Sequence, residues 1–139
     1  MTGVQPGVRR KLPAAREAVD QLCGELRIGL LADLPRSERF AIELLLREAL
    51  MNAVVHGAQD ERGAEIDCEV RPVTGGIRIR VADGGGGFDW RTRRDAGPRP
   101  LGESGRGLHI LHRYATRVRF SANGSQVELT RMFHQGGAL

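Results

Sequence analysis

The sequence has few cysteines, few aromatic residues and no long apolar run, and each shortage excludes a class of protein. Only 4% of the 139 residues are aromatic. Cys23 and Cys68 lie far apart and outside any C-x-x-C pair, so we expect buried free thiols and no zinc site. No apolar run reaches the roughly 20 residues that cross a bilayer. The N-terminal residues 1–7 lack an apolar signal core. Export and membrane anchoring are therefore not expected, and the cytoplasm is the expected compartment.

Lysine is scarcer still, and several nucleotide-binding motifs are missing with it. Lys11 is the only lysine, and it precedes the first clear strand, which excludes the strand lysine of protein kinases. No G-x-x-x-x-G-K-[ST] motif is present. Gly105-x-Gly107 lacks the third glycine of a dinucleotide fingerprint and has no strand just before it. The sequence thus excludes P-loop proteins, the protein-kinase fold and dinucleotide-binding folds.

The basic residues are almost all arginine, and they give a formal net charge of +4. Four of them cluster in residues 91–99. Such a cluster fits nucleic acid, but it fits nucleotide phosphates, an acidic partner protein or a solvated loop equally well. The length suits one domain over residues 1–139, and 40% hydrophobic with 27% charged residues is an ordinary globular balance.

Hydrophobic periodicity predicts an alternation of helices and strands. Pro13 suits a first helical turn, Gly57 suits a helix C-cap, and 74–76 and 123–124 suit hairpin turns. The expected elements are an irregular segment or a short strand near 8–12, helices over 14–28 and 37–55, strands over 65–72 and 77–83, a loop over 84–104, a helix over 105–114, and strands over 117–122 and 125–133. This order predicts an α+β fold, a largely antiparallel sheet with helices on one face.

Three stretches could carry chemistry. Glu48 and Asn52 are four residues apart on the second helix, so they share a face. An acid beside an amide can hold a divalent cation and a water, although a polar stripe on a surface helix would look the same. Asp83 ends a strand before four glycines, where a carboxylate can accept a hydrogen bond from an exocyclic amine. Gly105-Arg106-Gly107 opens a helix, whose bare N–H groups attract phosphate.

In this order the stretches resemble the N, G1 and G2 boxes of the GHKL ATPase/kinase superfamily. The matching motifs are Glu48-x-x-x-Asn52-Ala53-x-x-His56-Gly57, Asp83-x-Gly85-x-Gly87-Phe88 and Gly105-Arg106-Gly107-Leu108. Within the superfamily they look most like the anti-sigma factor serine kinases of bacteria, the SpoIIAB and RsbW type. The resemblance spans about residues 12–133, and it implies a Bergerat-type sandwich with a mixed, mostly antiparallel sheet.

The resemblance also implies a role for each matching residue. Glu48 corresponds to the general base, Asn52 to the magnesium ligand and Asp83 to the acceptor of the adenine amine. The remaining residues implied in nucleotide binding are His56 in the N box, Gly85 and Gly87 at the hinge of a lid over about 88–104, Gly105, Arg106, Gly107 and Leu108 at the phosphate turn, and Ser125 near the adenine.

The activity implied is that of an ATP- and Mg²⁺-dependent kinase. It would bind a sigma factor, phosphorylate a STAS-type anti-sigma-factor antagonist on serine or threonine, and form a homodimer, without direct contact with nucleic acid or membrane. Three alternatives stay open. They are an ATP-binding anti-sigma module without kinase activity, the catalytic fragment of a sensor histidine kinase, and an arginine-rich nucleic-acid binder. The histidine-kinase alternative has no acceptor histidine in the first 50 residues.

Overall fold

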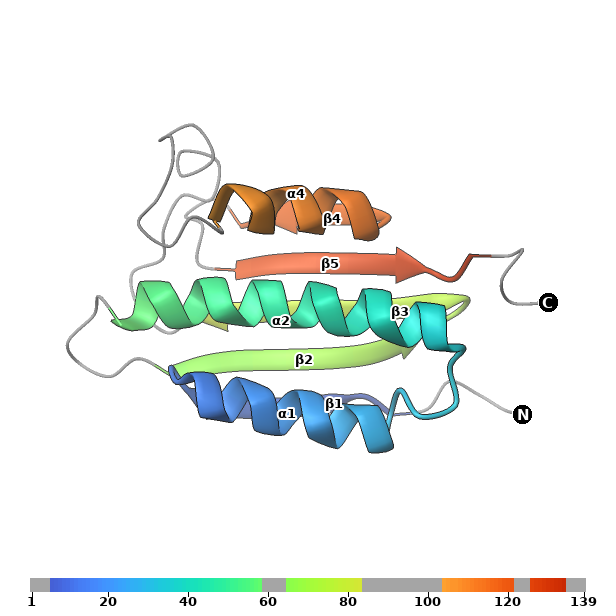
Figure 1. Ribbon diagram of the computed structural model, residues 1–139, viewed down its shortest axis with the longest axis horizontal. Helices are drawn as coiled ribbons and strands as arrows, with labels where there is room; N and C mark the ends of the chain where they lie inside the picture. Colours follow the sequence, from blue (N-terminus) through green and yellow to red (C-terminus); the bar gives the residue numbers. More distant parts are fainter. Residues whose placement is uncertain (1–5, 59–64, 84–103, 122–125, 135–139) are drawn as a thin grey trace.

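The computed structural model describes residues 6–58, 65–83, 104–121 and 126–134. Within these ranges, three helices lie on one face of a five-stranded sheet (Figure 1). The elements in chain order are β1 Val8–Pro13, α1 Arg16–Ile28, α2 Arg36–Ala58, β2 Glu65–Val73, β3 Gly76–Asp83, α4 Ser104–Tyr114, β4 Arg117–Phe120 and β5 Gln126–Met132. None of these helices is both long enough and apolar enough to cross a membrane.

The strands are ordered β1-β2-β3-β5-β4, and every neighbouring pair is antiparallel. The β2–β3 hairpin forms at the predicted turn, where Gly75 has a φ of 75°, a conformation that glycine adopts without strain. Gly76 must also be small, because a Cβ there would lie 2.3 Å from the carbonyl oxygen of Arg131. The predicted α+β fold with an antiparallel sheet and helices on one face is confirmed.

The core lies between the sheet and the helices. Alternate residues of the strands point into it, as the period-2 pattern predicted. Its buried apolar members on the strands are Leu12, Ile66, Cys68, Val70, Ile77, Ile79, Val81, Val127 and Leu129. Helix α2 contacts β2, β3 and β5 as well as both other helices, so it is the central element of the helical layer. Full burial of each Leu or Ile on α2 stabilises the fold by about 1.5–3 kcal/mol.

Four predictions of local structure were wrong. Lys11 lies within β1 and not before the first strand. Pro13 ends β1 instead of opening a helix, and it is tolerated there because β1 is an edge strand that can lack a donor. Gly57 is not a C-cap, because α2 continues to Ala58. Phe40 was expected on a mostly buried helix but is 60% exposed, and its ring makes an edge-on contact with Tyr114 of α4 at 6.5 Å between centroids.

A buried ion pair joins three elements where α2 begins and α4 ends. Arg131 of β5 donates from Nε to Glu38 of α2 at 2.7 Å and from a terminal nitrogen to the carbonyl oxygen of Tyr114 at 2.7 Å. The backbone N–H of His134 also donates to Glu38. The side chain of Glu38 is 3% exposed and that of Arg131 17%, so this contact fixes the helices to the sheet at one end.

Candidate functional site

The candidate site lies at the other end of the sheet, where three elements meet. The C-terminal end of α2, the end of β3 and the start of α4 lie at the same side of the molecule (Figure 1). Helix α2 contacts both β3 and α4. Thus the sequence motifs around Asn52, Asp83 and Gly105, which are far apart along the chain, are carried by neighbouring elements.

The two flanks of α2 have different partners. Glu43 and Arg47 form ion pairs with Arg27 and Asp20 of α1, so their flank faces α1. At 100° per residue, Asn52 is rotated by roughly 140° from Arg47 around the helix axis. The flank with Glu48 and Asn52 is therefore turned away from α1, and α4 lies on that side of α2 (Figure 1). Both side chains are half-buried.

Asn52 is held by its own helix. Its amide nitrogen donates a hydrogen bond to the backbone carbonyl oxygen of Glu48 at 3.0 Å. This bond uses the donor end of the carboxamide, so the oxygen is the end that can meet a cation, and oxygen is the ligand that Mg²⁺ takes. Glu48 is half-buried beside it and makes contacts of its own. The shared face that the spacing predicted is present.

Asp83 is the last residue of β3 and pairs in register with Ile66 of β2. It is only 8% exposed, and it takes part in polar interactions. An Asp or Glu is almost never this buried unless it is paired. The end of β3 therefore carries a buried carboxylate that has polar partners. A carboxylate oxygen here can accept a hydrogen bond from an exocyclic amine at the end of the sheet.

Helix α4 begins at Ser104, and its first turn contains Gly105, Arg106 and Gly107. No acidic residue occupies this first turn, so nothing there offsets the positive end of the helix dipole. The first N–H groups of a helix have no intrahelical partner and attract phosphate. Gly105 and Gly107 have no side chain that could cover the backbone here, and the phosphate turn stays a prediction.

Other predicted site residues fall outside this description. Gly85, Gly87, Ser125 and most of the lid over 88–104 lie outside the described residues, as does the arginine cluster in 91–99. His56 is placed on α2, and Leu108 on α4, by their backbones. Within the described ranges, no three His, Cys, Asp or Glu side chains gather as a metal site. A magnesium ion at Asn52 would therefore take most of its ligands from phosphate oxygens and water.

The sequence interpretation missed two charged features. One is the buried pair of Glu38 and Arg131, which are 93 residues apart, and no local pattern could join them. The other is the direct opposition of Arg71 and Arg78 across the β2–β3 hairpin. The turn at Thr74-Gly75 would have been enough to predict it, since hairpin register follows from the turn.

Comparisons with known proteins agree with this fold. The model of the histidine kinase-like ATPase domain matches residues 12–131. Two relatives, each named serine-protein kinase RsbW, come from Listeria innocua serovar 6a and Listeria monocytogenes serovar 1/2a. Each is 30% identical over 147 aligned positions, covering 97% of this chain and 92% of the relative. The chain therefore belongs to the histidine kinase-like ATPase domain family, of the GHKL type.

Proposed function

We propose that this protein is an anti-sigma factor with ATP-dependent serine/threonine kinase activity. The observation that carries the proposal is the position of Glu48 and Asn52 on the flank of α2 turned away from α1, near the end of β3 and the start of α4. The names of the two RsbW relatives support a serine kinase. We further propose that residues 1–139 form one ATPase domain with a lid over about 88–104.

The residues at the site suit a magnesium nucleotide. Asp83 accepts the hydrogen bond of the adenine amine, and Asn52 provides an oxygen ligand to Mg²⁺. The first turn of α4, with Gly105, Arg106 and Gly107, meets the phosphates through backbone N–H groups and one guanidinium. His56, Leu108, Gly85, Gly87 and Ser125 complete the proposed nucleotide contacts.

Glu48 is the proposed general base. When bound, MgATP supplies the phosphoryl group and the cationic charge that offsets the phosphates. The Glu48 carboxylate takes the proton of a serine or threonine hydroxyl on the partner, which makes that oxygen a better nucleophile. The hydrogen bond from Asn52 to the carbonyl oxygen of Glu48 keeps base and metal ligand in a fixed relation, one turn apart on the same helix.

The proposed partners are a sigma factor and a STAS-type antagonist, and the antagonist is the phosphate acceptor. The protein acts as a homodimer in the cytoplasm, where sigma factors work. In this partner-switching cycle, the protein binds the sigma factor until unphosphorylated antagonist takes the place of the sigma factor. Phosphorylation of the antagonist then resets the cycle.

The test is transfer of labelled phosphate from ATP to the antagonist in the presence of magnesium. Wild-type protein should label the antagonist. Glu48→Ala should lose at least about 100-fold in rate, the usual contribution of a general base, while keeping its nucleotide affinity. Full turnover by Glu48→Ala would show that another group is the base.

The alternative is a binding module that holds ATP and the sigma factor without phosphorylating anything. The same assay separates the two, because a binding module leaves the antagonist unlabelled while still retaining the sigma factor. The presence of Glu48 beside Asn52 favours the kinase, since ATP binding alone does not require a base.

A further inference from the structure

The face of the sheet that the helices leave open carries charged side chains in register. One row of this face crosses all five strands with alternating sign, and neighbouring members oppose each other directly. This row consists of Arg9, Glu69, Arg80, Glu128 and Arg119. Opposite charges across strands stabilise a sheet. Arg80 reaches Glu69 at 3.2 Å, and Arg9 pairs with Asp67 of β2, so the row's arginines on β1 and β3 have acidic partners within the sheet.

The next row on the same face is different. Arg71 opposes Arg78 directly, Arg78 opposes Thr130, and Thr130 opposes Arg117. We call these four residues the cationic row. It contains three guanidinium groups and no carboxylate, and like charges directly opposite each other destabilise a sheet.

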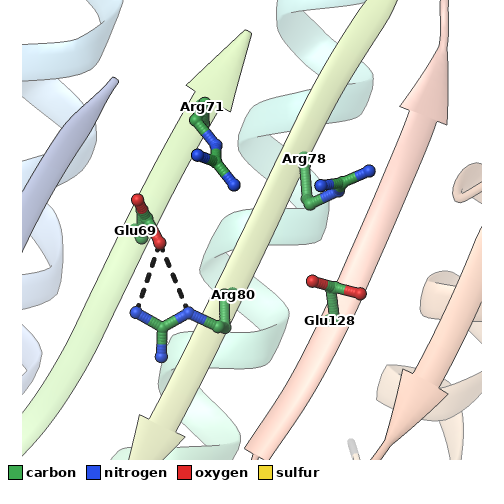
Figure 2. A pocket seen from close by; sticks show the side chains of 5 residues that line it. All are labelled: Glu69, Arg71, Arg78, Arg80 and Glu128. Atoms are coloured by element: carbon green, nitrogen blue, oxygen red, sulfur yellow. Dashed lines mark hydrogen bonds and ion pairs between the residues drawn. The ribbon is translucent and has the colours of Figure 1, made fainter. Parts of the chain in front are cut away.

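The cationic row is also left unsatisfied. In the described part of the chain, Arg71, Arg78 and Arg117 have no ion pair, and the buried Nε of Arg78 has no hydrogen-bond partner. Arg71 and Arg78 also line a hollow of about 40 Å³, together with Glu69, Arg80 and Glu128 of the alternating row. Figure 2 shows Arg80 held by Glu69, whereas Arg71 and Arg78 reach out from β2 and β3 without such a contact.

The cationic row runs across the strands, and its length and spacing indicate an extended ligand. Strands lie about 4.8 Å apart, so the three steps from Arg71 to Arg117 span roughly 14 Å. An extended peptide that crosses the strands presents alternate side chains on one side about 6.6 Å apart. Two or three carboxylates of such a peptide can meet the three arginines at once.

We infer that the cationic row is a docking surface for an acidic, extended segment of a partner protein. Carboxylates bind guanidinium groups through charge-assisted hydrogen bonds, and they would satisfy the donors that the sheet leaves unpaired. The surface lies on the face opposite the helices, so it goes beyond the proposed nucleotide site and is independent of it.

Charge also argues against the other occupants. A nucleic acid would bring continuous negative charge onto Glu69 and Glu128 of the adjacent alternating row. A second copy of this chain would bring its own three arginines against these, and like charges repel. Discrete acidic side chains in a protein segment fit both rows.

The test uses the full chain and a synthetic peptide of about ten residues that alternates aspartate and threonine, which is long enough to cover the row. Fluorescence anisotropy measures binding at about 50 mM salt, where screening is weak. The triple variant Arg71→Gln, Arg78→Gln, Arg117→Gln should bind on the order of tenfold more weakly, because each exposed charge pair contributes modestly.

The matched control removes an equal number of positive charges, three, from the helical side of the molecule. The exposed residues for it are Arg16, Arg36 and Arg113, each changed to Gln. This variant should keep the affinity of the wild type. Melting curves by circular dichroism check that both variants are folded.

Three results would overturn the inference. The first is equal peptide affinity of wild type and of the variant that lacks the row arginines. The second is tighter, row-dependent binding of duplex DNA of equal charge. The third is a mass in light scattering that halves only in the row variant, which would make a second copy of the chain the occupant.

Discussion

Cys68 on β2 is 1% exposed within the core, and this burial raises the pKa of its thiol to about 12. A thiol in an unfolded chain has a pKa near 8.5. Because the native value is the higher of the two, the contribution of Cys68 to stability is complete below the unfolded pKa and is lost as the pH rises toward 12. Burial also raises the pKa of Cys23, so both thiols are protonated and unreactive in the native protein near neutral pH.

We therefore expect alkaline destabilisation that depends on Cys68. Between pH 9 and 11, the free energy of unfolding should fall by about 1.4 kcal/mol per pH unit through this group. Urea unfolding at several pH values, under reducing conditions, measures it. In Cys68→Ala, which is less stable at pH 7 because of the lost packing, the decline should be shallower. An unchanged slope in Cys68→Ala would contradict the assignment.

The direct opposition of Arg71 and Arg78 across the β2–β3 hairpin leads to a second prediction. Arg71→Glu turns the like-charged pair with Arg78 into an opposite-charged pair, so it should stabilise the protein by about 0.5 kcal/mol. The opposite substitution for comparison is Arg119→Glu, which places a new carboxylate opposite Glu128. This variant should destabilise the protein by a similar amount. Urea unfolding of the two variants at low salt checks this, and both effects should shrink at 1 M salt. The same sign for both variants would count against the register argument.

At the scale of elements, the three helices are held differently along the sheet. Helix α2 is tied to α1 by surface ion pairs, of which Arg47 with Asp20 is one. Such pairs are worth at most about 1 kcal/mol. The pair of Glu38 and Arg131 is buried, and it connects α2 to β5 and to the end of α4. Breaking a buried pair is costly because it leaves a charge without compensation.

Glu38→Gln should accordingly destabilise the protein by about 3 kcal/mol at pH 7. Burial alone would raise the pKa of Glu38, but Arg131 and the backbone N–H of His134 together lower it. Its contribution is thus present above the unfolded pKa and is lost as the pH falls through the native pKa. Urea unfolding should show a smaller difference in the free energy of unfolding between Glu38→Gln and the wild type at pH 4 than at pH 7.

The matched control for this pair is Glu25→Gln. Glu25 lies 3.7 Å from Arg10, and both side chains are about half exposed. The substitution should change the free energy of unfolding by less than about 1 kcal/mol at either pH. A Glu38→Gln effect no larger than this would mean that the buried pair does not hold the elements together.

At the scale of the whole molecule, the fold has one end closed by Glu38 and Arg131 and another where the C-terminal end of α2, the end of β3 and the start of α4 lie on the same side. This division suits a nucleotide-binding protein, because ligand sites sit on elements held in place elsewhere. Ligand that binds the folded state alone adds to stability by mass action.

MgATP at about 100 times its dissociation constant should stabilise the wild-type protein by roughly 2.7 kcal/mol. Asn52→Ala should lose most of this shift because it removes the proposed magnesium ligand, whereas Arg16→Gln, on α1, should keep it. Thermal denaturation with and without MgATP measures the effect, and chelation of the metal should abolish it in the wild type. An undiminished shift in Asn52→Ala would exclude Asn52 as the ligand.

Most of the architecture follows from local sequence patterns. Period-2 and helical spacing are local properties, so the order of elements and the shared face of Glu48 and Asn52 followed from them. The element boundaries expected at Pro13 and Gly57 did not follow from local spacing, because tertiary pairing outweighed local propensity. Pro13 pairs with Glu65 in the β1–β2 ladder, and Gly57 lies inside α2, which continues to Ala58.

Which distant charges meet depends on the order of the strands and the packing of the helices. Glu38 and Arg131 pair across 93 residues, and Arg78 comes into one row with Arg117 only because β5 lies between β3 and β4. The physical reason is that Coulomb energy depends on distance in space and on burial, and strand order sets both. Sequence spacing located the candidate nucleotide site, and sheet register located the cationic row.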